Sequence, residues 1–290
     1  MSSSSLSGRT FEGAAREDGT VGVRDNVLVL PSVICSHLVA ERIAARVDDA
    51  VATPHDHGCA QLGADNEQTQ RTLLSIAQNP NVAGTVVVGL GCEEVQSAEV
   101  ATALESRDVP VRELSIQDVG GTDECVEQGV EAATELVQSR HTTRTAADIS
   151  DLTIGIVSSD LDASTIESAD PLVGRVADDV IAAGGRVVVA GNERLVANPE
   201  DAREAATEDA RDSMGDLLDR HEGHPARATR VGQFTRNRSY EEVTRGWGSA
   251  PISEVLSYGE RSTLSEGLTA VDAPSRFAEA TTALAAADAN

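Results

Sequence analysis

Short apolar runs recur along the first half of the chain, and each is followed by a polar turn and a stretch with helical spacing. The clearest runs lie at residues 26–30, 85–88 and 111–116, and a weaker one ends at Pro54. Continuous apolar runs of this length are typical of strands that are covered on both faces. Repeated strand–turn–helix units of this size predict a parallel, doubly wound α/β sheet.

The same pattern returns in the second half. Residues 152–157 and 186–190 are predicted to be strands, and the helix between them should stop at Gly184-Gly185. Beyond them we expect a charged helix at 199–222, largely irregular chain at 223–250 and an alanine-rich helix at 278–287. The second half therefore also belongs to the α/β class.

We therefore expect two consecutive Rossmann-like parallel-sheet domains, and 290 residues are enough for two such cores. The predicted order is a flexible segment at 1–20, a first domain with the Cys and His motifs at 21–140, a linker at 141–150 and a second, truncated domain at 151–290.

The chain is strongly acidic, with a formal net charge of −25, and all 23 of its basic residues are arginine. Such a surface repels nucleic acid and anionic membranes. The acidity fits either an interaction surface or a halophilic adaptation to a salty cytosol. We favour the second, because the carboxylates are spread along the chain and lysine is absent. The four cysteines form no disulfide framework, and no apolar leader or spanning segment is visible, so we expect a cytoplasmic location.

Residues 55–67 combine two imidazoles, a thiol, three carboxylates and two glycines between two apolar runs. These polar and charged side chains do not contribute to a hydrophobic core. They fall on a predicted strand-to-helix turn, where open α/β sheets place their ligands. Gly58 and Gly63 would let the backbone approach a bound ion closely. We therefore look for chemistry here.

Three of the four cysteines, Cys35, Cys59 and Cys92, each follow a predicted strand by a few residues. Because parallel strands point their carboxyl ends to the same edge, these thiols could converge on one rim. With nearby histidines they predict an iron site, either a ferrous ion or an iron–sulfur cluster with one open iron. The alternative is that free cysteines are simply buried small residues, and we prefer that alternative for Cys125.

The histidines and carboxylates are weighed in the same way. His55 and His57 alternate along an extended segment, so they should point to opposite sides, and one rather than both should be a ligand. Glu93 follows Gly-Cys directly after a strand and is the best candidate for a general acid or base. His221, in polar surroundings like His141 and His224, should be solvated.

A nucleotide site is a weaker alternative. Gly89-Leu90-Gly91 follows a strand and partly matches a dinucleotide-binding turn, but the third glycine of that motif is missing. Cys92-Glu93 would also place a carboxylate where a pyrophosphate should lie. We therefore rank nucleotide binding below metal-assisted chemistry.

Several ordered motifs together resemble the altronate/galactarate dehydratase family, whose body is shared with sulfolactate sulfo-lyases. The resemblance covers residues 17–137 and is carried by Gly-Thr-Val-Gly-Val-Arg-Asp at 19–25, Pro-Ser-Val-Ile-Cys at 31–35, His-Asp-His-Gly-Cys at 55–59, Arg-Thr-Leu at 71–73, Asn-Pro-Asn-Val at 79–82 and Val-Gly-Leu-Gly-Cys-Glu at 88–93.

The second half departs from that family's pattern. Where the family tends to carry Cys-Gly-Gly-Ser-Asp after a strand, this chain has Val-Ser-Ser-Asp-Leu-Asp at 157–162. Where the family carries Glu-Glu-Lys-Ser, residues 237–244 lack the lysine, and Asp-Ala-Pro-Ser at 272–275 replaces Asp-Thr-Pro-Gly. These departures concern substrate binding.

The resemblance implies a hydro-lyase that removes water from a sugar acid such as altronate or galactarate, with iron polarising the hydroxy-acid end. On this hypothesis Cys59, Cys92, Cys35 and His55 are metal ligands, and Glu93 and His57 transfer protons. A small helper subunit or a second copy of the chain would be its protein partner. The alternative is a non-catalytic paralogue or partner subunit of such a dehydratase.

Overall fold

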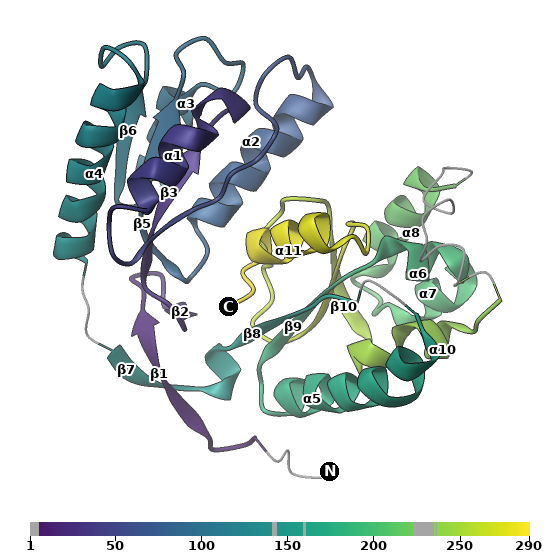
Figure 1. Ribbon diagram of the computed structural model, residues 1–290. Coiled ribbons are helices and arrows are strands. Elements are labelled where there is room, and N and C mark those ends of the chain that lie inside the picture. The colour runs from purple at the N-terminus through teal and green to yellow at the C-terminus, as the bar shows by residue number, and fades with distance from the viewer. Residues whose placement is uncertain (1–5, 141–143, 159–160, 223–234, 236) are drawn as a thin grey trace. The chain divides into compact units, whose positions relative to one another are not determined.

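The computed structural model describes residues 6–140, 144–158, 161–222, 235 and 237–290. The chain divides into two units, an N-terminal unit of residues 12–145 and a C-terminal unit built mainly from residues 146–290. Each unit contains a four-stranded parallel sheet (Figure 1), so the predicted pair of Rossmann-like domains is confirmed. His141, Ser159, Asp160 and His224 lie outside the described residues.

The sheet of the N-terminal unit has the strand order β4-β3-β5-β6. Its strands are β3 (Asn26–Pro31), β4 (Ala50–Ala52), β5 (Val82–Gly89) and β6 (Val111–Ser115). All three pairings are parallel, and Leu28 of β3 lies opposite Val51 on one side and Thr85 on the other. The side chains of residues 27–30 are at most 1% exposed. The continuous apolar run at 26–30 therefore forms a central strand that is covered on both faces, as its pattern predicts.

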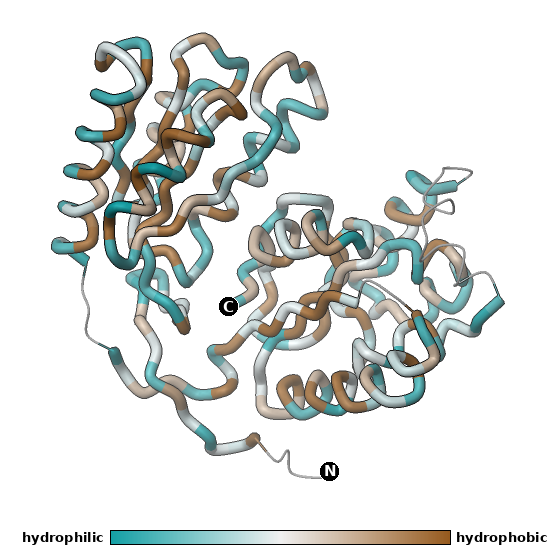
Figure 2. The backbone as a smooth tube through the Cα atoms, in the orientation of Figure 1, coloured by the Kyte–Doolittle hydropathy of each residue, from teal (hydrophilic) through white to brown (hydrophobic). Residues whose placement is uncertain are grey.

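Four helices cover this sheet, two on each face. They are α1 (His37–Ala44), α2 (Ala64–Ala77), α3 (Ser97–Glu105) and α4 (Thr122–Ser139). Ile43 of α1 and Val126 of α4 pack with Val27 on one face. Leu73 of α2 and Leu104 of α3 pack on the other. Figure 2 shows apolar residues along the strands and at intervals along these helices. Because all four strands run the same way, their following loops meet at one edge of the sheet.

The sheet of the C-terminal unit has the order β10-β11-β9-β8. Its strands are β8 (Thr153–Ile156), β9 (Arg186–Ala190), β10 (Ile252–Leu256) and β11 (Gly267–Val271). Its helices include α5 (Asp170–Ala182), α6 (Asn192–Ala197), α7 (Pro199–Ala205), α8 (Arg211–Arg220), α10 (Tyr240–Thr244) and α11 (Phe277–Ala286). Helices α5 to α8 pack on one face and α11 packs on the other. The two central strands, β9 and β11, are almost fully buried.

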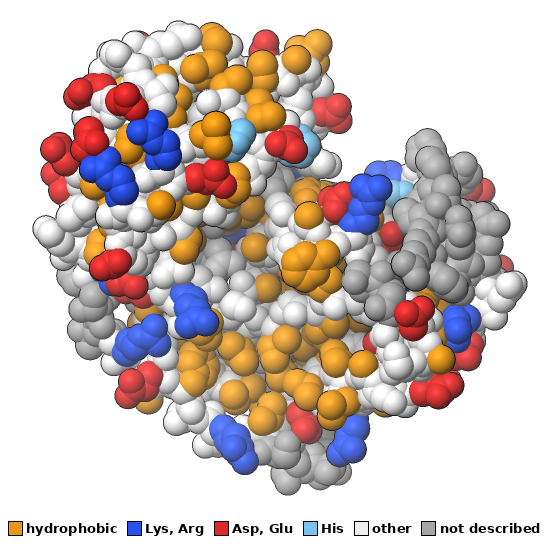
Figure 3. Space-filling model, viewed as in Figure 1, with side chains coloured by type: hydrophobic (Ala, Val, Ile, Leu, Met, Phe, Trp, Pro, Cys, Tyr) orange, Lys and Arg blue, Asp and Glu red, His pale blue; other side chains and the backbone are white. Residues whose placement is uncertain are grey.

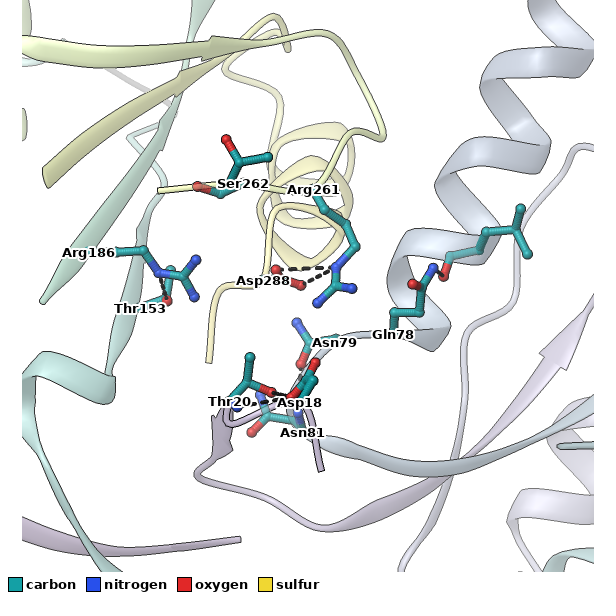
Figure 4. Close-up of polar contacts among 12 residues, drawn as sticks. Asp18, Thr20, Gln78, Asn79, Asn81, Thr153, Arg186, Arg261, Ser262 and Asp288 are labelled. Atoms are coloured by element: carbon teal, nitrogen blue, oxygen red, sulfur yellow. Dashed lines mark hydrogen bonds and ion pairs between the residues drawn. The ribbon is translucent and has the colours of Figure 1, made fainter. Parts of the chain in front are cut away.

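Two arginines form polar contacts between separate segments of the C-terminal unit. The guanidinium Nε of Arg261 donates to both carboxylate oxygens of Asp288, at 3.0 and 3.2 Å (Figure 4). The side chain of Asp288 is only 3% exposed, so this ion pair is protected from solvent on one side. Arg186 Nε donates to the hydroxyl of Thr153 at 2.9 Å, which links neighbouring strands β9 and β8. Both of these arginines therefore form specific contacts within the C-terminal unit.

Two expected boundaries differ from the structure. Residues 10–15, within the stretch that was expected to be flexible, form strand β1 (Thr10–Ala15), and residues 144–148 of the expected linker form β7 (Arg144–Asp148). With β2 (Val21–Gly22) they make a small sheet of order β2-β1-β7. Neither segment has an apolar run, so backbone pairing that local composition does not encode gives them their strand structure.

The region between residues 199 and 260 also differs. The expected charged helix at 199–222 is divided into α7 and α8, and Ala206 between them bridges to Ile252. Strand β10, which sequence analysis did not predict, lies at the edge of its sheet and carries polar Ser253 and Glu254 in its middle. An edge strand can carry such polar residues because only one of its sides is paired. Within the described part of the chain, none of the helices combines the length and apolar content that a membrane crossing requires.

Candidate functional site

Three loops lie together at the carboxyl end of the N-terminal sheet, and we call them the rim loops. They are residues 32–36 after β3, residues 53–63 after β4 and residues 90–96 after β5. The backbone N–H of Ile34 donates to the carbonyl oxygen of His57 at 2.8 Å, which joins the first loop to the second. Gly58 lies so close to the first loop that an added Cβ would be 2.2 Å from the Ser32 carbonyl oxygen. Only glycine fits at this point, where φ is +91°.

Glu93 joins the third loop to the first. Its side chain is buried, and Oε1 accepts a 3.0 Å hydrogen bond from the Ser32 hydroxyl. Oε2 accepts backbone N–H groups from Gly91 at 2.6 Å and Cys92 at 2.9 Å, and the N–H of Leu90 lies 3.2 Å from both oxygens. The loop therefore folds around the carboxylate of its own Glu93.

This environment favours the charged form of Glu93. Burial by itself would raise the pKa of the carboxyl group, but hydrogen bonds from backbone N–H groups and from Ser32 outweigh it and hold the pKa below its ordinary value. A carboxylate whose two oxygens are already occupied in this way holds its loop in shape. The proton-transfer role expected for Glu93 stays a prediction, and the geometry supports a positioning role.

His55 and His57 do not point to opposite sides, as the alternation of an extended segment predicted. Their rings stack with centroids 6.1 Å apart and planes 17° from parallel. The expectation was wrong because β4 ends at Ala52, and the chain then turns so that the backbone N–H of His57 donates to Nδ1 of His55 at 3.1 Å. Figure 3 shows histidine and acidic side chains at the surface of this unit.

The hydrogen bonds of His55 define its protonation state. Burial lowers its pKa, which favours the neutral ring. Nδ1 accepts from His57, so the proton lies on Nε2, which donates to the carbonyl oxygen of Pro31 at 2.7 Å. Both nitrogens of His55 are thus committed to shaping the rim loops, whereas His57 is exposed.

The four cysteines fall into two classes. Cys35, Cys59 and Cys92 are exposed, one on each rim loop, and Cys125 is buried within α4. Burial raises the pKa of the Cys125 thiol to about 11, so this residue is the inert core thiol that was expected. The shared position after consecutive strands therefore does place three accessible thiols on neighbouring loops.

A metal site requires its ligand side chains to converge on one point, which their position on neighbouring loops does not guarantee. Among the residues that the structure describes, no group of three or more His, Cys, Asp or Glu side chains is arranged so that it could hold a metal ion. His55 has no ring nitrogen left to donate to a metal in this arrangement. The observed arrangement therefore does not fit iron as it stands. The ligand roles of Cys35, Cys59, Cys92 and His55 stay predictions.

The backbone around the third rim loop also bears on nucleotide binding. A dinucleotide turn needs backbone N–H groups that face the pyrophosphate. In this chain the N–H groups of Leu90, Gly91 and Cys92 all face the carboxylate of Glu93. The loop is thus occupied by an internal anion, which argues against nucleotide binding there.

Two residues that hold the site together were missed by the sequence analysis. Ser32 is fully buried and binds Glu93, and the side-chain oxygen of Gln61 accepts from the N–H of Gly58 at 2.9 Å and from the hydroxyl of Thr69 at 3.0 Å. Ser32 follows β3 directly, which is the signal that could have identified it. Gln61 has no comparable signal, because its role depends on how its loop folds back.

Comparison with known proteins agrees with this part of the molecule. Residues 13–141 match the family model described as D-galactarate dehydratase/altronate hydrolase, second domain. Over 303 aligned positions the chain is 31% identical to the altronate dehydratase of Bacillus subtilis, with 96% of this chain and 60% of the relative covered. Residues 13–141 therefore form a second domain of the altronate/galactarate dehydratase family.

Other members of the altronate/galactarate dehydratase family give the same picture. The Escherichia coli altronate dehydratase is 30% identical over 300 positions, which cover 94% of this chain and 59% of the relative. The (2R)-sulfolactate sulfo-lyase subunit beta of Chromohalobacter salexigens is 32% identical over 184 positions, which cover 63% of this chain and 46% of the relative. The chain thus spans about three fifths of the length of the altronate dehydratases that it matches.

Proposed function

We propose that this chain acts in the dehydration of a sugar acid or a related hydroxy acid, as a carbon–oxygen hydro-lyase. The observation that carries the proposal is its similarity to altronate dehydratases along almost all of its length, at 30–31% identity. The rim loops support it, because they carry two imidazoles, three exposed thiols and a buried carboxylate at the edge where open parallel sheets bind ligands.

The chemistry of the dehydration determines which catalytic groups such a site needs. In the dehydration of a 2,3-dihydroxy acid, a base removes the proton on the carbon next to the carboxylate. The hydroxyl group on the following carbon leaves with a proton as water. The enol that remains tautomerises to a 2-oxo acid, so all atoms are accounted for. The site needs a base, an acid and a group that binds the carboxylate.

His57 is our candidate for the base. It is exposed on the second rim loop, and its ring lies against the neutral ring of His55. His55 holds the backbone of His57 and so acts as a positioning residue. Glu93 positions the third loop against the first through Ser32. Histidine side chains commonly act as general bases near neutral pH.

A turnover assay tests the proposal. Purified chain would be incubated with altronate, galactarate and sulfolactate under anaerobic conditions, and 2-oxo acid formation would be followed. We expect one of these acids to be consumed, and His57→Gln to lower turnover by at least about a hundredfold. His37→Gln, which alters a histidine on the neighbouring α1, is the matched control and should retain activity. Full turnover by His57→Gln would contradict the assignment.

Iron is tested separately, by measuring metal content after anaerobic purification with added ferrous iron. When bound, iron would supply a Lewis acid for the hydroxy-acid end of the substrate. If the rim thiols hold it, Cys59→Ser and Cys92→Ser should lower the iron content, and Cys125→Ser should not. Equal iron content in all three variants would remove these thiols from the ligand set.

A second candidate function is that of a non-catalytic partner subunit of such a dehydratase. It is favoured by one relative, the (2R)-sulfolactate sulfo-lyase of Chromohalobacter salexigens, being named as a subunit. Affinity purification of the tagged chain from its own cells distinguishes the two. Stoichiometric recovery of a longer family member, with no turnover by the chain alone, would support the subunit role.

A further inference from the structure

The C-terminal unit has a topological switch point between its two central strands. Strands β9 and β11 are parallel neighbours. The chain leaves β9 into α6, whose Leu195 packs on one face of the sheet, and leaves β11 toward α11, whose Leu284 packs on the other. Open α/β sheets bind ligands at the carboxyl ends of strands whose loops diverge in this way. Asn192 and Asp272 follow β9 and β11 at this point.

Four side chains form a continuous network there, and we call them the switch-point cluster: Asn192, Arg220, His221 and Asp272. Oδ1 of Asp272 lies 2.7 Å from Nε2 of His221 and accepts from Nδ2 of Asn192 at 2.9 Å. Oδ2 accepts from Nε and Nη2 of Arg220 at 3.1 and 3.0 Å. His221 was expected to be solvated, but this contact with Asp272 gives it a fixed orientation.

His221 and Arg220 each keep hydrogen-bonding groups that Asp272 does not occupy. Because Nε2 of His221 is directed at the carboxylate, Nδ1 is the ring nitrogen left for another partner. The guanidinium of Arg220, whose side chain is 48% exposed, spends only Nε and one Nη2 contact on Asp272. Further N–H groups of a guanidinium can bind a carboxylate in the geometry that this ion prefers. Figure 3 shows basic, acidic and histidine side chains together on the surface of this unit.

Asn192 supplies an independent sign of a ligand. The residue is 5% exposed, and its Oδ1 is buried without a hydrogen-bond partner among the described residues. An unsatisfied buried acceptor destabilises the folded state, so such atoms usually have a partner. The same amide donates through Nδ2 to Asp272, so the side chain of Asn192 is part of the cluster. Oδ1 can only accept, so the missing partner is a donor such as a hydroxyl group.

We propose that the switch-point cluster is a binding site for a small carboxylate that also carries a hydroxyl group. Arg220 binds the carboxylate, Asn192 Oδ1 accepts from the hydroxyl, and Asp272 holds Arg220, His221 and Asn192 in place. This site is built from residues of the C-terminal unit alone and is distinct from the rim loops. The proposal does not require turnover by the chain, so it can stand or fall separately from the proposed function.

Calorimetric titration of the whole chain tests the site. D-Gluconate is the probe, because it has both a carboxylate and hydroxyl groups. Hexanoate has only the carboxylate, sorbitol has only hydroxyl groups, and sulfate is an anion with neither group. We expect gluconate to bind at least about tenfold more tightly than each of the other three, since only it satisfies both Arg220 and Asn192. Absence of gluconate binding, or equal affinity for sulfate, would overturn the proposal.

Variants locate the bound probe. Arg220→Gln should weaken gluconate binding about tenfold or more, and Arg220→Lys should weaken it less, because the charge remains. Arg203→Gln is the matched control. Arg203 of α7 forms an exposed ion pair with Asp219, which lies on α8 next to Arg220. His57→Gln in the rim loops should bind gluconate normally. Loss of binding in His57→Gln with retention in Arg220→Gln would assign the probe to the rim loops and overturn the proposal.

A spectroscopic readout distinguishes binding from a purely structural role of Arg220. The imidazole resonances of His221, assigned by their loss in His221→Gln, should shift on addition of gluconate and stay unchanged on addition of sorbitol. Circular dichroism would establish that Arg220→Gln is folded. If that variant is unfolded, Arg220→Lys alone decides the matter, and unweakened binding by it together with unshifted His221 resonances would contradict the site.

Discussion

The hydroxyl of Ser32 donates a 3.0 Å hydrogen bond to Oε1 of Glu93, although the two residues are 61 positions apart. Both are buried, and each lies in a loop that follows a strand of the same parallel sheet. This contact ties the first rim loop to the third. It makes Glu93 the residue on which the shape of the candidate site depends.

Replacement of Glu93 tests that dependence. Glu93→Gln keeps the size of the side chain but replaces one accepting oxygen with an amide group that meets the N–H groups of Gly91 and Cys92. We expect a loss of about 2–3 kcal/mol in the free energy of unfolding, because hydrogen bonds to a charged group are lost. Urea titration measures it. Glu94→Gln, at an exposed neighbour, should change stability by less than about 0.5 kcal/mol.

The lowered pKa of His55 makes stability depend on pH. The unfolded chain binds a proton near pH ~6.5, whereas the folded chain resists it, because burial of the His55 ring disfavours its charged form. Stability from this group is therefore present above that pH and is lost as the pH falls through it. Urea titrations of the native chain and His55→Gln should converge as the pH is lowered. A difference that grows on acidification would contradict this assignment.

The close approach at Gly58 predicts a large cost for one added methyl group. Gly58→Ala would combine a strained φ of +91° with a Cβ 2.2 Å from the Ser32 carbonyl oxygen. We expect a loss of about 3 kcal/mol or more. Gly63→Ala is the control, because its φ is also positive but nothing lies within 4 Å of the added Cβ. It should cost only about 1 kcal/mol, and equal losses at both positions would show that no clash occurs.

Thiol labelling tests the division of the cysteines. In the native chain, a thiol reagent should modify Cys35, Cys59 and Cys92, which are exposed, and spare Cys125, whose pKa burial raises to about 11. Denaturant should make the fourth thiol available. Mass spectrometry of proteolytic fragments identifies each modified residue. Rapid labelling of Cys125 in the native chain would mean that α4 opens readily.

Salt should stabilise the fold. A net charge of −25 creates repulsion between carboxylates, and added salt screens it. We propose that the acidity is a halophilic adaptation, and we therefore expect the thermal midpoint to rise steadily from low to molar potassium chloride. Glucose at matched osmolality serves as the uncharged control. A midpoint that stays constant or falls with salt would remove the adaptation hypothesis.

The strands with continuous apolar runs, as at residues 26–30, could be predicted from the sequence because burial on both faces requires such runs. Strands β1, β7 and β10 lack such runs and were not predicted. The parallel arrangement then followed from the repeated strand–turn–helix units, and with it the placing of Cys35, Cys59 and Cys92 on neighbouring loops. Asn192 and Asp272 also lie within two residues of a strand end, and this position is the signal in the sequence that points to the switch-point cluster.

The sequence by itself determined the two parallel sheets, the rim on which the chemistry-bearing residues lie and the family, since these depend on local periodicity and on ordered motifs. Only the tertiary structure decided that Glu93 binds its own loop, that His55 and His57 stack, and that His221 meets Asp272 across 51 positions of the chain. The physical reason is that a hydrogen bond between distant loops depends on strand register and backbone turns, which no short stretch of sequence encodes.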